Sequence, residues 1–185
     1  MVQIRLAGAC DLTGLPAMEL ATGDLFRALG MDAVADDNPP TTEDLARYQR
    51  AGRLLVADDG GRVVGYLLID VLPGAAHIEQ VTVHPNHARR RIGRDLIDAA
   101  EHWARRRGLT WLTLTSYRDV PWNAPYYARL GFDVLDQDEL SPELRAVRQA
   151  EAARGLDAWP RVTMRRQIGS AGRTGRHERS RHSAM

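Results

Sequence analysis

The sequence predicts an α/β domain of the α+β kind, in which helices pack on a sheet. Residues 77–83 are rich in β-branched side chains and residues 92–103 carry apolar side chains at helical spacing, so a strand runs directly into a helix. A DDGG turn at residues 58–61 lies between two further strand-like segments, which is typical of a β-hairpin. Residues 111–116 then alternate large and small side chains, as expected of another strand.

Local signals predict the remaining elements. Apolar side chains at helical spacing indicate a first helix capped by Thr13 and ended by Gly30. Residues 31–40, which contain the aspartate pair Asp36 and Asp37 and a double proline, are expected to form an exposed loop before a helix capped by Thr41 or Thr42. We expect strands at residues 2–6, 53–57, 62–71, 132–135 and 161–166, and helices at residues 123–130 and 141–153, the latter being an insertion before the last strand.

Composition bounds the class of protein. A chain of 185 residues forms one ordinary domain, and a net charge of +1 argues against a dedicated nucleic-acid binder. The single cysteine, Cys10, cannot form an intramolecular disulfide, and no signal peptide or membrane-length apolar segment is visible. We therefore expect a cytoplasmic protein, and every basic residue outside histidine is arginine, as in GC-rich bacterial genomes.

The join between the strand and the helix, at residues 84–91, carries three consecutive arginines and is followed by Gly93. The first turn of a helix has about four unpaired N–H groups and a partial positive charge, so it favours an anion. Gly93 lets a ligand approach the backbone closely. The join is therefore a candidate phosphate site, although arginines at a helix start also occur as a solvated surface.

A second motif, YYARLGF at residues 126–132, follows a separate strand and a proline-rich turn. Together the two segments resemble the GNAT superfamily of acyl-CoA-dependent N-acyltransferases, whose cofactor loop reads (Q/R)xxGx(G/A) and whose later motif reads (F/Y)YxxxGF. The matching residues are Val83, His84, Pro85, Ile92 and Gly93 in the first motif and Tyr126, Tyr127, Gly131 and Phe132 in the second. The resemblance covers residues 2–166. It implies a GNAT-like twisted central sheet, mixed but mostly antiparallel, of six to seven strands flanked by helices.

Two residues depart from the family pattern. Ala88 stands where the family has Gln or Arg, and Arg91 stands where it has its first Gly. Neither change removes a backbone N–H group, but Arg91 would be strained in a conformation that only glycine adopts freely. We interpret the arginines of the loop as adding charge where the family relies on amides.

The resemblance implies acetyl-CoA as the acyl donor and assigns its contacts. The pantetheine arm would pair with the backbone of Val81, Thr82 and Val83, and the pyrophosphate would lie on the amides of Arg89, Arg90, Arg91, Ile92, Gly93 and Arg94. The family's cofactor-binding asparagine falls at Val120 by the usual spacing. Asn123 is therefore either a cofactor contact or a helix cap.

Acyl transfer to an amine requires a base and a proton donor. Glu79 is the candidate base because it shares strand parity with His77, Val81 and Val83 and precedes the pantetheine-binding stretch. The alternative is a purely structural role, in which Glu79 forms a salt bridge with a neighbouring arginine. His77 is the second candidate. Tyr127 matches the family tyrosine that protonates the departing thiolate, and Tyr126 matches an aromatic packing position. No metal site is expected.

Acidic residues before residue 45 and Trp122 suggest a small amine, an amino acid or an amino sugar as acceptor. Two other readings stay open: an acyl-CoA-binding module without catalysis, and a toxin that acetylates aminoacyl-tRNA, for which an arginine-rich tail is suggestive. The predicted organisation is an N-acetyltransferase domain at residues 1–167 and a disordered tail at residues 168–185. Membrane association is not expected, and a homodimer is compatible with the sequence.

Overall fold

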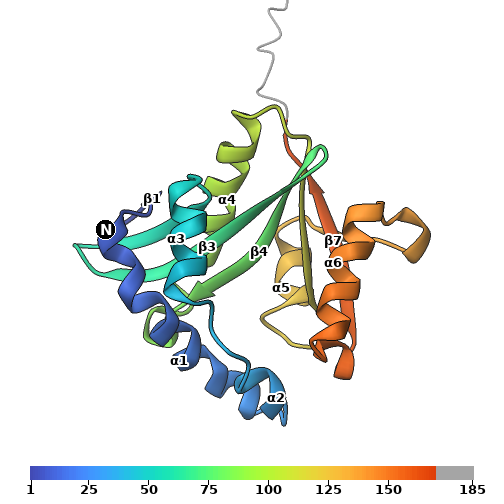
Figure 1. The fold of residues 1–185 in the computed structure, drawn as a ribbon, viewed down its shortest axis with the longest axis horizontal. Coiled ribbons are helices and arrows are strands. Elements are labelled where there is room, and N and C mark those ends of the chain that lie inside the picture. The colour runs from blue at the N-terminus through green and yellow to red at the C-terminus, as the bar shows by residue number, and fades with distance from the viewer. Residues whose placement is uncertain (170–185) are drawn as a thin grey trace, which may run out of the picture.

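A seven-stranded sheet runs through the structure, a computed structural model in which residues 1–169 are described (Figure 1). Its strands are β1 (Val2–Leu6), β2 (Leu54–Asp59), β3 (Val63–Leu72), β4 (Ala75–Val83), β5 (Trp111–Tyr117), β6 (Asp133–Val134) and β7 (Arg161–Gln167). The helices are α1 (Leu15–Arg27), α2 (Asp32–Ala35), α3 (Thr42–Arg50), α4 (Ile92–Arg105), α5 (Ala124–Arg129) and α6 (Pro142–Ala153). Short 3-10 turns η1 (Ala9–Gly14), η2 (Pro85–His87), η3 (Gln137–Glu139) and η4 (Leu156–Ala158) connect them.

The strand order is β1-β2-β3-β4-β5-β7-β6. The β4–β5 pair is parallel and the other neighbouring pairs are antiparallel, which confirms the predicted mixed, mostly antiparallel sheet. The parallel pairing extends only from Ala75–Trp111 to Ile78–Leu114. Beyond Ile78 the two strands separate, so the centre of the sheet is open on one side of β4.

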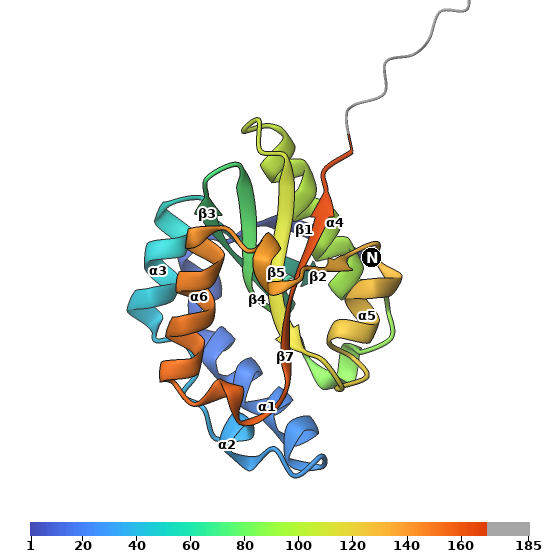
Figure 2. The ribbon, with the colours of Figure 1, turned by 90° about the vertical axis from the view of Figure 1, so that its right-hand side faces the viewer.

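Helices cover the two faces of the sheet unequally (Figure 2). Helix α4 buries Ile92, Leu96 and Trp103 against one face, in the largest apolar core of the protein. Helices α1 and α3 cover the other face, where Tyr66 and Leu45 are fully buried. Helix α6 lies on this second side as well, next to β5 and β7.

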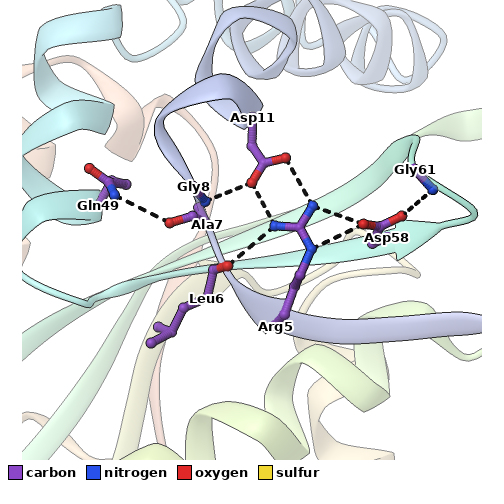
Figure 3. A network of polar contacts seen from close by, with 8 residues as sticks. All are labelled: Arg5, Leu6, Ala7, Gly8, Asp11, Gln49, Asp58 and Gly61. Carbon is purple, nitrogen blue, oxygen red and sulfur yellow. Dashed lines mark hydrogen bonds and ion pairs between the residues drawn. The ribbon is translucent and has the colours of Figure 1, made fainter.

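A polar network fastens the N-terminal strand to its neighbours (Figure 3). Arg5 on β1 donates from Nη1 to Asp11 in η1 at 2.6 Å and from Nε to Asp58 on β2 at 3.0 Å. The Arg5 guanidinium lowers the pKa of the Asp11 carboxyl. Asp11 also accepts a bond from the backbone N–H of Gly8, so one arginine links the strand, the 3-10 turn and the β2–β3 hairpin.

Most element predictions are confirmed to within about two residues, and three need correction or qualification. Thr13 does not cap the first helix, because residues 9–14 form η1 and the helix begins directly after it. The segment expected to be a loop at residues 31–40 contains the one-turn helix α2. The tail was predicted to begin at residue 168, but Ile168 is buried in the core, so packed structure reaches beyond Gln167. Residues 170–185 of the predicted tail lie outside the described part of the chain.

Candidate active site

A cleft of about 1100 Å³ opens where β4 and β5 separate. One end of the cleft is the loop before α4, and the other end is enclosed by α1, α3 and α6. Most of the residues predicted to form the site line this one cleft: Glu79, Val81, Thr82, Val83, Arg89, Arg91, Ile92, Gly93, Arg94, Asn123 and Tyr127. Arg90 and His77 do not.

A β-bulge determines which way the side chains of β4 point. The β3–β4 register shifts between Leu68, which faces Gln80, and Ile69, which faces Ile78, so Glu79 is the extra residue. The predicted common parity of Glu79 with Val81 is therefore wrong. Val81 and Val83 pack toward the α4 core, whereas Gln80 and Thr82 reach α1 on the opposite face.

Glu79 has no hydrogen-bond or ion-pair partner among the described residues, so the predicted alternative of a salt bridge to an arginine is not observed. Its side chain is accessible from the cleft, yet the protein atoms around it remove part of its water shell. This desolvation raises the pKa of Glu79, and the carboxylates of Asp70 and Glu151 act in the same direction. A free carboxylate with a raised pKa is suited to accept a proton near neutral pH.

His77, the second candidate base, is buried with only 1% of its surface exposed. Its Nδ1 lies 3.0 Å from the hydroxyl of Thr113, and its Nε2 has no partner in the described chain. Burial lowers the pKa of His77. The ring is therefore a neutral core group that a substrate in the cleft does not reach.

Tyr127 comes from α5 and lines the cleft. Its ring lies edge-on to Phe132 at 6.0 Å and to Tyr126 at 5.5 Å, and its hydroxyl has no partner within residues 1–169. Burial raises the pKa of Tyr127 well above its usual range, so the phenol stays protonated at neutral pH. It is a neutral hydrogen-bond donor that lines the cleft.

The loop before α4 presents a row of backbone N–H groups. No described residue accepts a hydrogen bond from the N–H groups of residues 89–94, because α4 begins at Ile92 and its first turn has no preceding helix. Arg91 occupies the N-cap position in the left-handed region, with φ 63° and ψ 6°. Arg89 also has φ 63°. The loop therefore keeps a glycine-like backbone shape with arginine side chains, and the expected strain at Arg91 is present.

Arg90 differs from its neighbours. Its Nη1 donates to Asp59 at the end of β2, at 3.0 Å. Its side chain therefore points out of the cleft and ties the loop to the sheet. Only its backbone N–H belongs to the row of unpaired N–H groups at the start of α4.

Asn123 occupies the N-cap position of α5, but its side chain makes no capping hydrogen bond. The helix-capping interpretation of its side chain is therefore wrong. The amide lines the cleft and is free to contact a ligand. Val120, at the position of the family asparagine, is instead buried in a small apolar cluster with Tyr117 and Met31.

Glu19 on α1 borders the cleft, whereas the sequence placed it only among the acidic residues before residue 45. It accepts hydrogen bonds from Tyr66 at 2.8 Å, from Thr82 at 2.5 Å and from Gln80 at 2.7 Å. Desolvation raises its pKa despite these bonds. Glu19 thus ties α1 to β4 beside the bulge. Nothing in the local sequence distinguishes it from Asp24, the other acidic residue of α1.

Residues 1–169 contain neither a candidate metal site nor a membrane-spanning helix. No cluster of three or more histidine, cysteine, aspartate or glutamate side chains is arranged to hold a metal ion. None of the helices in this range is both long and apolar enough to span a bilayer. The arginine-rich segment that suggested an RNA substrate lies at residues 170–185, outside this range.

Solved structures with this fold include several acetyltransferases. The PaiA N-acetyltransferase of Thermoplasma acidophilum, solved with coenzyme A, has a TM-score of 0.67 at 15% identity, covering 90% of this chain and 99% of that one. The ribosomal-protein-S18-alanine N-acetyltransferase of Escherichia coli has a TM-score of 0.62 at 18% identity, covering 94% and 98%. N-acetylglutamate synthase of Neisseria gonorrhoeae, solved with coenzyme A and N-acetyl-glutamate, has a TM-score of 0.69 at 16% identity, covering 92% of this chain and 36% of that one.

These similarities, at such low identity, establish the fold alone. The family assignment comes from the sequence: residues 20–132, more than half of the chain, match the family described as Acetyltransferase (GNAT) family. The matched range contains the open edge of β4, the loop before α4 and the YYARLGF motif. The chain is a member of the GNAT acetyltransferase family, whose acetyl donor is acetyl-CoA.

Proposed function

We propose that this protein transfers an acetyl group from acetyl-CoA to the primary amine of a small molecule, with Glu79 as the base and Tyr127 as the proton donor. The observation that carries the proposal is the continuity of one cleft. The unpaired N–H groups before α4, the open edge of β4, the carboxylate of Glu79 and the phenol of Tyr127 all border it.

The residues present fit acetyl-CoA. The N–H groups of residues 89–94, supported by the guanidinium groups of Arg89, Arg91 and Arg94, would hold the pyrophosphate. The edge of β4 from Val81 to Val83 lacks a strand partner on the β5 side and would bind the amides of the pantetheine arm. Asn123 would offer its amide to the same arm. When bound, acetyl-CoA supplies an activated acetyl thioester.

The side chains then divide the proton transfers between them. Glu79 accepts one proton from the substrate ammonium, which makes the nitrogen nucleophilic, and passes that proton to solvent. The C–N bond forms as the C–S bond breaks, and Tyr127 gives its proton to the departing sulfur. The second proton lost by the nitrogen returns through water to Tyr127. One proton is released in each turnover, and both side chains regain their starting state.

The enclosure of the acceptor side favours a small substrate. Arg154, just after α6, donates to Asp37, just after α2, at 2.7 Å. Both residues border the cleft, as Glu79 does, so this ion pair connects two walls of the cleft. A cleft of about 1100 Å³ that must also admit the pantetheine arm leaves room for a small molecule.

The first test is the midpoint of thermal unfolding with and without acetyl-CoA. A ligand at a hundred times its dissociation constant stabilises by about 2.7 kcal/mol, and each kcal/mol moves the midpoint of such a chain by roughly 2–4 °C. We expect an increase of several degrees. An absent shift would exclude the proposed donor site.

The second test is release of free coenzyme A thiol with a panel of amines, amino acids and amino sugars. Turnover with at least one acceptor is expected. A thermal shift without release for any member of the panel would instead support an acyl-CoA-binding module without catalysis.

A further inference from the structure

We propose that the acceptor is an amino acid, and that Arg161 binds its free carboxylate while its amine faces Glu79. This inference rests on the proposed acetyl transfer and adds a binding site for a second group of the acceptor. Both side chains border the same cleft. The argument comes from the hydrogen-bonding state of Arg161.

Arg161 is held in a fixed position at the wall of the cleft. It opens β7 opposite Tyr117 of β5, and its guanidinium lies 4.5 Å from the centre of the Tyr117 ring. Its side chain is only 8% exposed. Nη2 donates to Thr115 at 3.0 Å and to Glu151 at 2.7 Å. Stacking and bonding on one side thus fix the plane of the guanidinium.

Two donor atoms of Arg161, Nε and Nη1, have no hydrogen-bond partner in the described chain, although the guanidinium lies near enough to the Tyr117 hydroxyl to oppose the rise in the pKa of Tyr117 that burial causes. A guanidinium has five N–H groups, of which Nη2 carries two. Nε is buried and has no partner in the described chain. Nη1 makes no hydrogen bond within residues 1–169 and is not one of the buried atoms that lack a partner, so it keeps some exposed surface, and Arg161 borders the cleft. A charged donor held in a protein wall with unmet N–H groups favours an anionic partner.

The charges around the cleft match an acceptor with one positive and one negative group. Glu151 pairs with both Arg161 and Arg148, the latter at 2.6 Å, and Arg148 also pairs with Asp157 at 2.7 Å. Arg154 at the same rim is itself paired with Asp37 at 2.7 Å. Glu79 is the carboxylate without a described partner. An ammonium at Glu79 and a carboxylate at Arg161 would complement both groups at once.

The planar, two-oxygen carboxylate suits a guanidinium whose orientation is already set, because little side-chain entropy is lost on binding. A water molecule could also accept from Nη1. If water is the only partner of Nη1, the protein should bind an acid and its neutral amide equally well. Comparing these two affinities therefore distinguishes a carboxylate site from a water site.

The test is binding of Nα-acetyl amino acids to the full chain saturated with coenzyme A, measured by calorimetry. Each of the twenty common Nα-acetyl amino acids is compared with its Nα-acetyl carboxamide, which has the same shape but no negative charge. We expect at least one acid to bind about tenfold or more tightly than its carboxamide. Equal affinity for every acid and amide pair would overturn the proposal.

Variants test whether Arg161 is the residue that distinguishes the acid from the carboxamide. R161Q should abolish the preference for the acid, and R161K, which keeps the charge but loses the planar guanidinium, should reduce it. The matched control is R165Q on the same strand, since Arg165 pairs with Glu139 at 3.0 Å and does not border the cleft. R165Q should keep the full preference. A preference that survives in R161Q would place the carboxylate elsewhere and contradict the inference.

These experiments distinguish failure of the carboxylate site from failure of the proposed acetyl transfer. If the protein acetylates amines but binds Nα-acetyl amino acids no better than their carboxamides, the inference is wrong and the proposed function stands. If it binds the acids preferentially but never releases coenzyme A, the carboxylate site stands and the proposed transferase activity is wrong. If R161Q does not fold, the comparison of acids with carboxamides in the wild-type protein decides the question.

Discussion

The hydroxyl of Tyr126 lies over Gly93, 3.2 Å from the point where a β-carbon on that residue would stand. Val83 is the next neighbour at 3.8 Å. The absence of a side chain at Gly93 therefore makes room for Tyr126 as well as for a ligand at the start of α4. Because Tyr126 contacts Tyr127 edge-on, this spacing connects the loop before α4 to the proposed proton donor.

Gly93→Ala should push the Tyr126 ring by a few tenths of an ångström and disturb Tyr127. We expect a loss of about tenfold in kcat/KM, the size of a small misplacement near the reacting groups, with no loss of stability, because alanine is a better helix former than glycine. Tyr126→Phe removes the crowded oxygen. The double variant G93A/Y126F should therefore recover most of the activity. A double variant as poor as G93A alone would show that the methyl group blocks the ligand directly.

Arg91→Gly should stabilise the fold. A non-glycine residue in the left-handed region costs roughly 1–2 kcal/mol, which glycine avoids in part. For a chain of this size we expect the unfolding midpoint to rise by about 2–4 °C. Arg91→Ala is the matched control, since it removes the same charge but keeps a β-carbon. The two variants should weaken acetyl-CoA binding equally and differ only in stability. Equal midpoints would mean that the loop relaxes around Arg91.

The sequence predicted the sheet, its helices and the residues around the cleft because each depends on short-range patterns. A hairpin turn, an amphipathic helix and the YYARLGF motif are readable within a few residues. The orientation of Glu79 could not be predicted in this way, because the bulge arises from how β3 pairs with β4. The role proposed for Arg161 could not be predicted from local sequence either. It looks like an ordinary strand residue until the fold places it beside Thr115 and Glu151.

Tyr127→Phe tests the proposed proton donor. The hydroxyl has no described partner to lose, so the variant should fold with unchanged stability and bind acetyl-CoA within a few-fold of wild type. Turnover should fall by roughly 10²-fold or more, the usual scale for one positioned proton donor. An unchanged rate in Y127F would remove this residue from the mechanism.

Glu79→Gln tests the proposed base through pH. Only the ionised carboxylate accepts a proton, and the pKa of Glu79 is raised, so wild-type activity should fall on acidification at a higher pH than for an ordinary glutamate. The variant lacks this group, and its deficit should shrink as pH rises and the substrate amine loses its proton unaided. Glu43→Gln, at a side chain 75% exposed, should leave the profile unchanged. A deficit that is constant with pH would indicate structural damage instead.

Glu19→Gln should change how stability depends on pH. The folded-state pKa of Glu19 is raised above its unfolded value because desolvation outweighs the bonds from Thr82 and Tyr66. The folded state therefore holds this proton more tightly than the unfolded chain does. Wild-type stability should fall as pH rises from about 4.3, the unfolded value, through the higher folded pKa. E19Q lacks this loss, so its unfolding free energy relative to wild type should increase over that range and then level off.

Asp11→Asn provides a control of opposite sign. Arg5 lowers the pKa of Asp11, so the ionised carboxylate stabilises the fold at neutral pH and that contribution is lost on acidification. D11N should therefore be less stable than wild type at pH 7, and the gap should close as pH falls below about 4. Urea unfolding of the three proteins between about pH 3 and pH 8 measures both slopes. If E19Q follows the same pH dependence as wild type, Glu19 is not the desolvated carboxylate that fastens α1 to β4.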